Sequence, residues 1–263
     1  MFAAKSLCCA AVLFASFAGF NYAQDKPASE YEPQSGQQGK DVVWVPTPQI
    51  VVDKMLAIAN VGPADMVIDL GSGDGRTVIT AAQKGARALG IEYNPDMVEL
   101  SRRAADKAGV SNNATFVTAD LFETSFADAS VVTMFLLPEL NLKLRPKILS
   151  LKAGTRIVSN TFTMGEWEPD ERADLAGHPG CTISYCRVLF WLVPLRVEGT
   201  HKVAQGELTL KQEFQMLTGT LRTARATVKV SGRVRGENVE LTAGSKQYRG
   251  QLKDGLLELR EAG

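Results

Sequence analysis

The segment that most constrains this chain is a glycine-rich turn directly after a short apolar run. Residues 66–70 read Met-Val-Ile-Asp-Leu and residues 71–76 read Gly-Ser-Gly-Asp-Gly-Arg. An apolar run of this length is typical of a strand buried on both faces. Glycines in the turn let the backbone bend tightly and approach a ligand closely, because no side chain blocks it. A helix that starts there offers free amide donors. The pattern therefore predicts a strand–turn–helix unit that binds a ligand.

Strands and helices alternate through the first two thirds of the chain. Apolar residues at helical spacing predict helices over 49–59, 76–84, 95–108 and 140–151. Short apolar runs predict strands over 66–70, 88–92, 115–119, 131–136 and 156–160. Strands that are apolar on both faces and alternate with helices form a parallel sheet covered on two sides, and right-handed crossovers make it doubly wound. The predicted fold class is α/β, with a doubly wound, mostly parallel sheet.

The pattern changes in the C-terminal third. Short alternating segments follow one another from residue 206, with turn signals at 235–238 and 253–255. Two of these stretches resemble each other, and their glycines, Gly232 and Gly250, are 18 positions apart. We therefore predict a C-terminal antiparallel β module. The expected division is an α/β domain over 41–195 and the β-rich module over 196–263.

The N-terminus has the pattern of an exported protein. Lys5 precedes an uncharged apolar stretch over 7–20, and Ala23 stands before a polar break. This order predicts a signal peptide over residues 1–23 and export to the periplasm or cell envelope. An uncleaved leader that anchors the protein in a membrane is the alternative. Residues 24–40, rich in Gln, Pro, Ser and Gly, are typical of a linker.

Two cysteines remain after the leader. Cys181 and Cys186 are five positions apart, so on a straight strand their side chains point to opposite faces. A disulfide between them needs an intervening turn, and we favour two unpaired, buried cysteines in a strand region. His178 lies nearby, but these three side chains fall short of a zinc ligand set. We expect no metal site.

Acidic and apolar side chains mark the ends of successive predicted strands, where open parallel sheets bind ligands. Glu92 lies 23 positions after Asp69, and its carboxylate has two acceptor oxygens for the two hydroxyls of a ribose. Asp120 can accept a hydrogen bond from an adenine amine, with Leu121 packed on the ring. Phe135 ends the next strand, where cofactor and substrate would meet.

These positions favour S-adenosylmethionine over a dinucleotide. A nicotinamide dehydrogenase has the fingerprint G-x-G-x-x-G. In this chain the third glycine comes one residue early, and Asp69 precedes the first glycine. Alternatively, the glycines serve only a tight turn, but this would not explain the acidic residues at three successive strand ends.

The motifs resemble those of class I S-adenosylmethionine-dependent methyltransferases over about residues 45–165. The resemblance is carried by DLGSGDGR (69–76), GIEYNP (90–95) and TAD before LF (118–122). WVPTP (44–48) and SNTF (159–162) narrow it to the small lysine methyltransferases that in mitochondria modify the c-ring of ATP synthase and the adenine nucleotide translocase. The export-type leader and the β tail depart from that subfamily.

The resemblance implies a methyltransferase domain over 41–195 that binds S-adenosylmethionine. It places Asp69, Gly71 and Gly73 around the methionine moiety, Glu92 on the ribose, Asp120 and Leu121 at the adenine, and Val45–Pro48 over the cofactor. The predicted cofactor-binding residues are Asp69, Gly71, Gly73, Asp74, Glu92, Asp120, Leu121, Thr47 and Phe135.

Methyl transfer needs alignment more than acid–base chemistry, because the leaving group departs neutral. The expected acceptor is a protein lysine, with a small molecule as the alternative. A methyltransferase-like binding protein without catalysis is a further alternative. Candidate catalytic residues are Asp74, Glu139 and Asn160, and Phe162 and Trp167 are candidates for the acceptor side. The 29 basic and 29 acidic residues cancel, so no nucleic-acid partner is expected. The oligomeric state stays open.

Overall fold

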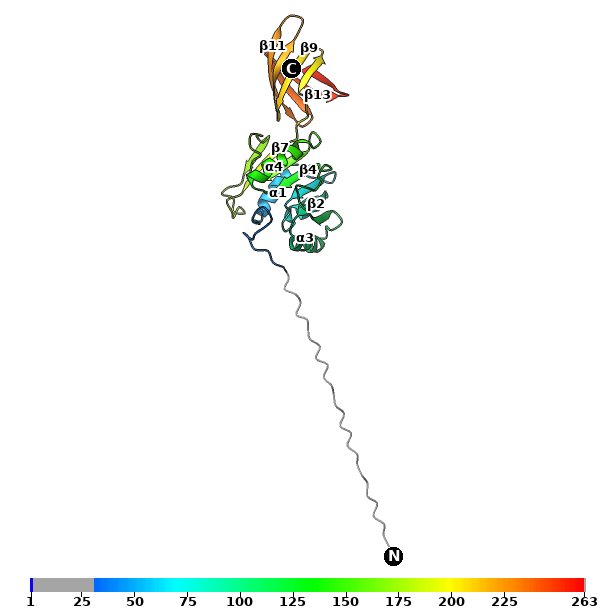
Figure 1. Ribbon diagram of the computed structural model, residues 1–263, viewed down its shortest axis with the longest axis vertical. Coiled ribbons are helices and arrows are strands. Elements are labelled where there is room, and N and C mark those ends of the chain that lie inside the picture. Colours follow the sequence, from blue (N-terminus) through cyan, green and yellow to red (C-terminus); the bar gives the residue numbers. More distant parts are fainter. Residues whose placement is uncertain (2–30, 263) are drawn as a thin grey trace. The chain divides into compact units, whose positions relative to one another are not determined.

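A seven-stranded sheet organises the first part of the chain. The computed structural model describes residue 1 and residues 31–262. The strand order is β3–β2–β1–β4–β5–β7–β6. Figure 1 labels β2, β4 and β7 of this sheet. The strands are β1 Met66–Leu70, β2 Arg87–Glu92, β3 Ala114–Thr118, β4 Val131–Met134, β5 Arg156–Asn160, β6 Glu171–Asp174 and β7 Arg187–Leu192. The first five strands pair in parallel, and β7 pairs antiparallel with both β5 and β6. The predicted doubly wound, mostly parallel sheet is confirmed.

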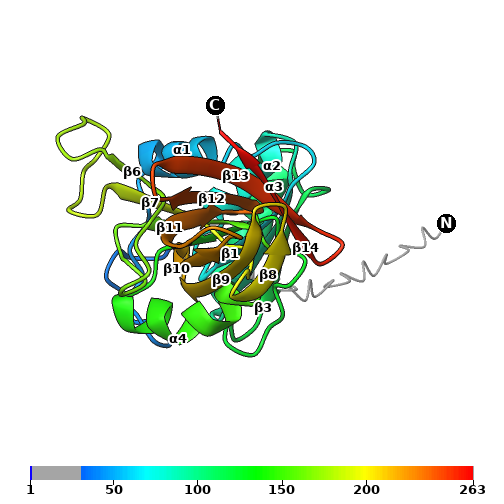
Figure 2. The ribbon, with the colours of Figure 1, turned by 90° about the horizontal axis from the view of Figure 1, so that it is seen from above.

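In the part of the chain that the structure describes, four helices cover this sheet. They are α1 Gln49–Ile58, α2 Arg76–Gln83, α3 Pro95–Lys107 and α4 Pro138–Leu149. The first three lie on one face of the sheet and α4 on the other, as Figure 2 shows. Alternate residues of a strand supply the two cores: Val158 packs on the α1 side and Ile157 on the α4 side. Among the described residues, no helix is both long and apolar enough to cross a membrane.

Strands β4 and β6 of this sheet differ from the prediction. Strand β4 ends at Met134, so Phe135 and Leu136 lie in the loop that follows rather than in the strand. Strand β6, at the edge of the sheet, was not predicted. Its sequence Glu-Arg-Ala-Asp is almost wholly exposed and therefore lacks the apolar signal on which the prediction depends.

The C-terminal module is a second seven-stranded sheet, with the order β14–β13–β12–β11–β10–β9–β8. Its strands are β8 Gly199–Val203, β9 Gly206–Glu213, β10 Met216–Arg222, β11 Thr227–Arg235, β12 Asn238–Ala243, β13 Lys246–Lys253 and β14 Leu256–Glu261. Every pairing is antiparallel, as predicted. The repeated stretches occupy equivalent places: Gly232 faces Leu241 and Gly250 faces Leu259 in two hairpins.

Hydrogen bonds and ion pairs join the two sheets. On β11, Arg233 pairs with Asp170 and Arg235 pairs with Glu171. The Asp170 side chain is fully buried, whereas the second pair is about half exposed. The Gln215 amide also donates to the carbonyl of Glu168 at 2.7 Å. The module is therefore attached to the segment that leads into β6.

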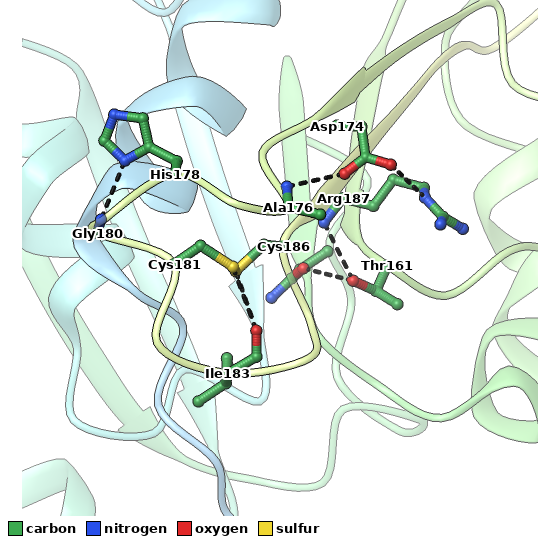
Figure 3. The surroundings of a disulfide bond; sticks show 10 residues. Thr161, Asp174, Ala176, His178, Gly180, Cys181, Ile183, Cys186 and Arg187 are labelled. Carbon is green, nitrogen blue, oxygen red and sulfur yellow. Dashed lines mark hydrogen bonds and ion pairs between the residues drawn. A yellow bond between two sulfur atoms is a disulfide. The ribbon is translucent and has the colours of Figure 1, made fainter.

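The expectation of two unpaired cysteines is wrong. Cys181 and Cys186 form a disulfide, with Cα atoms 6.0 Å apart (Figure 3). The physical reason is that no strand runs through them: they lie in the loop between β6 and β7. The chain turns between the two cysteines, and the turn brings their side chains together.

The N-terminal segments are described only in part. The predicted signal peptide and residues 24–30 of the predicted linker lie outside the described residues. From residue 34 the chain is ordered by backbone hydrogen bonds: Gly36 donates to Trp44 at 2.7 Å, and Trp44 donates to Gln37 at 2.9 Å. The end of the predicted linker is thus part of a folded turn.

Candidate functional site

A cavity of about 190 Å³ opens at the carboxyl ends of β1, β2 and β4. Its walls come from three regions: the glycine-rich turn after β1, the strap formed by residues 37–47, and a group of aromatic rings after β4 and β5. The cavity lies where the strand order changes direction between β1 and β4. Open α/β sheets bind ligands at this switch point.

Two glycines of the glycine-rich turn are packed too closely to carry a side chain. Gly71 and Gly73 have φ angles of +76° and +54°, which favour glycine. A methyl group on Gly73 would run into the indole of Trp44, and one on Gly71 would lie 3.1 Å from Leu136. The turn therefore exposes backbone to the cavity between Trp44 and Leu136.

Glu92 connects the turn to the end of β2. One carboxylate oxygen accepts a hydrogen bond from the Gly73 N–H at 2.9 Å, and the other accepts from the Asn94 N–H at 3.0 Å. Glu92 lines the cavity, and its role on a ribose stays a prediction. Because each oxygen has a further lone pair, both can still accept a hydroxyl donor.

Asp69 is the acid at the end of β1, and it is 6% exposed. Burial raises its pKa to about 7, while the hydrogen bond from Thr133 Oγ1, at 2.6 Å, opposes that rise. The nearby carboxylates of Glu92 and Asp74 also raise the pKa. A group of this kind changes charge near neutral pH and favours a cationic neighbour.

Asp74 is engaged by Arg76. The Arg76 Nε lies 3.0 Å and 3.1 Å from the two carboxylate oxygens, and its Nη1 donates to the carbonyl of Thr47 at 2.8 Å. Arg76 thereby ties the turn to the strap. Because the ion pair occupies Asp74, we do not assign it the role of a general base.

The strap covers the cavity from the N-terminal side. Val45, Pro46 and Thr47 line it, as the family resemblance implies. Lys40 lies 2.5 Å from the carboxylate of Asp120 and 4.7 Å from the centre of the Tyr93 ring. The Lys40 ammonium is the first cause that holds the pKa of Asp120 below its usual range. Leu121 lines the cavity, whereas Asp120 is not among the described residues that line it.

Three aromatic rings form one end of the cavity. Phe135, Phe162 and Tyr185 all line it, and their ring centres are 5.9, 5.6 and 5.5 Å apart in pairs. We call this group the aromatic wall. Phe135 and Phe162 were predicted for this region, but Tyr185 was not. The signal that could have found Tyr185 is the five-residue spacing of Cys181 and Cys186, because a loop closed by these two cysteines contains it.

The other acceptor-side candidates lie elsewhere. Trp167 is fully buried and packs against Trp191 and Phe214, so it belongs to the core. Asn160 is also fully buried, and its Nδ2 has no hydrogen-bond partner among the described residues. Glu139 is exposed in the first turn of α4. Neither Asn160 nor Glu139 is among the described residues that line the cavity.

Comparison with known proteins identifies the family. The family model for the ANTKMT methyltransferase domain matches residues 69–171. A protein-lysine N-methyltransferase of Saccharolobus islandicus is 44% identical over 133 residues, which are 49% of this chain and 83% of that protein. The chain belongs to the protein-lysine N-methyltransferase family.

Two further relatives of this methyltransferase match different shares of their own length. The mouse adenine nucleotide translocase lysine N-methyltransferase is 40% identical over 120 residues, 45% of this chain and 52% of that protein. The chain thus spans about half of that relative's length. A crystal structure of an RNA methyltransferase from Salinibacter ruber, in complex with S-adenosyl-L-homocysteine, is 46% identical with a TM-score of 0.54. It covers 58% of this chain and 96% of the other.

The cofactor of this methyltransferase is S-adenosylmethionine, and the cavity fits it. The glycine-rich turn leaves a cradle that a single Cβ would fill. Glu92 supplies acceptors suited to a diol beside that cradle. Ser72, buried in the cavity wall, has a hydroxyl without a hydrogen-bond partner among the described residues. The lining of the cavity is therefore polar at the turn and apolar toward Leu121 and Met97.

Proposed function

We propose that this methyltransferase transfers a methyl group from S-adenosylmethionine to the side-chain amine of a protein lysine. The observation that carries the proposal is a continuous cavity with the glycine turn and Glu92 at one end and the aromatic wall at the other. Such a cavity can hold a nucleoside at its polar end and an alkyl amine at its apolar end. The kinship with lysine methyltransferases supports the choice of amine.

Each wall of the cavity has a proposed role toward the cofactor. Glu92 accepts from the ribose hydroxyls, and Gly71 and Gly73 let the backbone approach the methionine moiety. Leu121 packs on the adenine, with Asp120 beside it. Asp69, Asp74 and Thr47 act around the turn: Asp69 supplies negative charge behind it, and Arg76 fixes Asp74 to the strap at Thr47.

The reaction needs a neutral amine and a fixed line of approach. When bound, S-adenosylmethionine supplies a methyl group on a sulfonium centre. The lysine ammonium would first lose a proton to solvent. Its neutral nitrogen would then form the new N–C bond as the C–S bond breaks, and S-adenosylhomocysteine would be the leaving group. Leu136 and Leu137 place apolar groups beside the approach, and burial among them lowers the pKa of a lysine ammonium. Alignment and desolvation by these residues are the proposed source of catalysis.

RNA is the second candidate acceptor, because the Salinibacter relative is named an RNA methyltransferase. The charge balance favours protein: 29 basic residues are offset by 29 acidic ones, and phosphate-binding surfaces usually carry a basic excess. A small-molecule amine or a non-catalytic binding protein would use the same cavity. An acceptor assay separates these cases.

We also propose that the protein is exported. The apolar stretch over residues 7–20 and the polar break after Ala23 support a cleaved leader. The Cys181–Cys186 disulfide supports it as well, because disulfides persist in oxidising compartments. Expression of the full chain in a bacterium with a periplasm, followed by N-terminal sequencing, tests this. A mature N-terminus at Gln24 in the periplasmic fraction is expected, and an intact Met1 in the cytoplasm would refute export.

The cofactor proposal is tested by calorimetric titration of residues 24–263 with S-adenosylmethionine and S-adenosylhomocysteine. We expect micromolar binding, about −8 kcal/mol, that Glu92→Ala weakens at least tenfold. Glu99→Ala is the matched control, because that side chain lies on the exposed face of α3. Binding that survives Glu92→Ala would remove Glu92 from the site.

The acceptor is tested separately with tritiated S-adenosylmethionine. A denatured cell-envelope protein fraction and a total RNA fraction are offered in parallel. Label in protein that survives ribonuclease and appears as methyllysine after hydrolysis is the expected result. Label that ribonuclease removes would support the RNA candidate instead.

A further inference from the structure

Tyr185 reaches the cavity from the loop that the disulfide closes. Only four residues, 182–185, separate the two cysteines, so the loop is short and its ends are joined covalently. Cys186 is 3% exposed and packs in the core beneath the sheet. Ile183, in the same loop, packs partly against that core. The disulfide therefore fixes this loop, in which Tyr185 directly precedes the buried Cys186.

The neighbouring strand supplies a second constraint. The N–H of Thr161 donates to the carbonyl of Arg187 at 2.6 Å. The Thr161 hydroxyl accepts from the Arg187 N–H at 3.3 Å, as Figure 3 shows. These bonds extend the β5–β7 pairing by one position beyond Asn160 and Val188. Phe162 follows Thr161, and Tyr185 is two residues before Arg187. The two rings are thus brought together by the same cross-strand contact.

Thr161 is held in an uncommon backbone conformation. Its φ angle is +63°, which is rare for a β-branched residue. Such conformations occur where the surrounding structure over-determines them, often beside a ligand. In this chain the turn redirects the backbone after β5 so that Phe162 faces Phe135 and Tyr185.

The charges around the wall leave its rings available to a cation. Arg187, the basic residue nearest in sequence to Tyr185, is paired with Asp174 at 3.6 Å (Figure 3). Tyr185 is 37% exposed, so its ring is partly open to an incoming group. Aromatic faces attract alkylammonium ions, because the ring quadrupole is negative above the plane.

We infer that the aromatic wall of Phe135, Phe162 and Tyr185 binds the alkylammonium side chain of the acceptor, and that the Cys181–Cys186 disulfide holds Tyr185 in that wall. This inference rests on the proposed transfer to an amine. It assigns Tyr185 a specificity-determining role and makes acceptor binding depend on the oxidised loop. Reduction of the disulfide is expected to weaken the acceptor end of the cavity while leaving the cofactor end intact.

The test uses n-butylammonium as the probe, because it has the four-carbon chain length and the charge of a lysine side chain. The uncharged counterpart is 1-butanol, of nearly equal size. Both are titrated at pH 7 by saturation-transfer NMR into the protein saturated with S-adenosylhomocysteine. We expect the oxidised protein to bind n-butylammonium about five-fold more tightly than 1-butanol.

Four variants separate the contributions. Tyr185→Phe keeps the ring and is expected to keep the preference, whereas Tyr185→Leu is expected to abolish it. Cys181→Ser with Cys186→Ser, which leaves the ring but frees the loop, is expected to reduce the preference at least two-fold. Ser184→Ala, an exposed position in the same loop, is the matched control. Affinity for S-adenosylhomocysteine should stay within about two-fold in all four variants.

The outcomes distinguish this inference from the function on which it rests. If the unmodified protein does not bind S-adenosylhomocysteine, the proposed function is overturned. Intact binding of that nucleoside with equal affinity for the two probes would overturn the aromatic-wall inference alone. An unchanged preference in Tyr185→Leu would remove Tyr185 from the wall, and an unchanged preference in the double cysteine variant would remove the disulfide from its support.

Discussion

Lys40 and Asp120 are 80 positions apart in the chain, and the Lys40 Nζ lies 2.5 Å from the Asp120 carboxylate. This ion pair is the contact between the strap and the loop after β3. It closes the strap over the side of the cavity where Leu121 lies. The finding connects a residue expected to belong to a linker with a residue expected to bind the cofactor.

Removal of that contact should loosen the strap. We expect Lys40→Ala to weaken S-adenosylmethionine binding about two- to five-fold, with most of the change in the dissociation rate. Stopped-flow displacement measures it. Lys40→Arg keeps the charge and should behave as the unmodified protein, and the difference shown by Lys40→Ala should shrink in high salt. A tighter complex in Lys40→Ala would show that Lys40 competes with the cofactor for Asp120.

The buried acid Asp69 predicts a specific pH dependence of stability. Its pKa is raised to about 7 in the folded protein, from an ordinary value of 3.8. Between these values the folded state binds more protons than the unfolded state, so the free energy of unfolding falls as pH rises from about 4 to about 7. The loss attributable to this group is up to about 4 kcal/mol.

Urea unfolding of the cofactor-free protein at pH 5 and pH 7.5 measures this effect. Asp69→Asn cannot ionise and should show a smaller fall between the two pH values than the unmodified protein. Asp128→Asn, at an exposed position, is the control and should change nothing. An equal fall in the Asp69 variant would mean that other groups dominate the pH response.

The two arginines of β11 offer a matched pair of substitutions. Arg233→Met leaves the fully buried Asp170 carboxylate without its cation, so we expect the free energy of unfolding to fall by about 3 kcal/mol. Arg235→Met breaks a half-exposed pair and should cost less than about 1 kcal/mol. Denaturant titration of both variants checks the difference. Equal costs would show that burial of Asp170 is unimportant for attachment of the β module.

Gly250 should be intolerant of a side chain although it lies in a regular strand. A Cβ at this position would overlap the carbonyl oxygen of Glu258 and crowd the Leu259 side chain, 2.8 Å away. We expect Gly250→Ala to destabilise the protein by about 1–3 kcal/mol. Gly62→Ala is the control, because a Cβ there meets nothing within 4 Å. Thermal unfolding of the two variants compares them, and equal midpoints would contradict the overlap.

The α/β fold was predictable because its strands and turn carry strong local signals. Asp69 and Glu92 end apolar runs, and the position of a residue at a strand end follows from the topology alone. The limits of β1 and β5 were correct for the same reason. The edge strand β6 was missed because its exposed residues, such as Glu171, need not alternate between apolar and polar.

The acceptor end of the cavity was harder to predict. Trp167 and Phe162 lie five positions apart after β5, and nothing local separates a core aromatic from one that lines a cavity. Their positions depend on long-range packing, against Trp191 for one and against Tyr185 for the other. The position of Tyr185 depends on the turn between the two cysteines. The apolar run that follows made this segment look like one long strand, so the turn was not predicted.

The cross-strand contact between Thr161 and Arg187 has a consequence for how this protein could change during evolution. The residues proposed to hold the methyl donor come from the strap and from positions 69–121, whereas two of the three rings of the aromatic wall come from 162–185. Acceptor preference could therefore drift through substitutions in one contiguous, covalently closed stretch without disturbing the donor end. A chimaera that exchanges residues 161–187 with those of a relative would inherit the relative's acceptor and keep its own affinity for the donor.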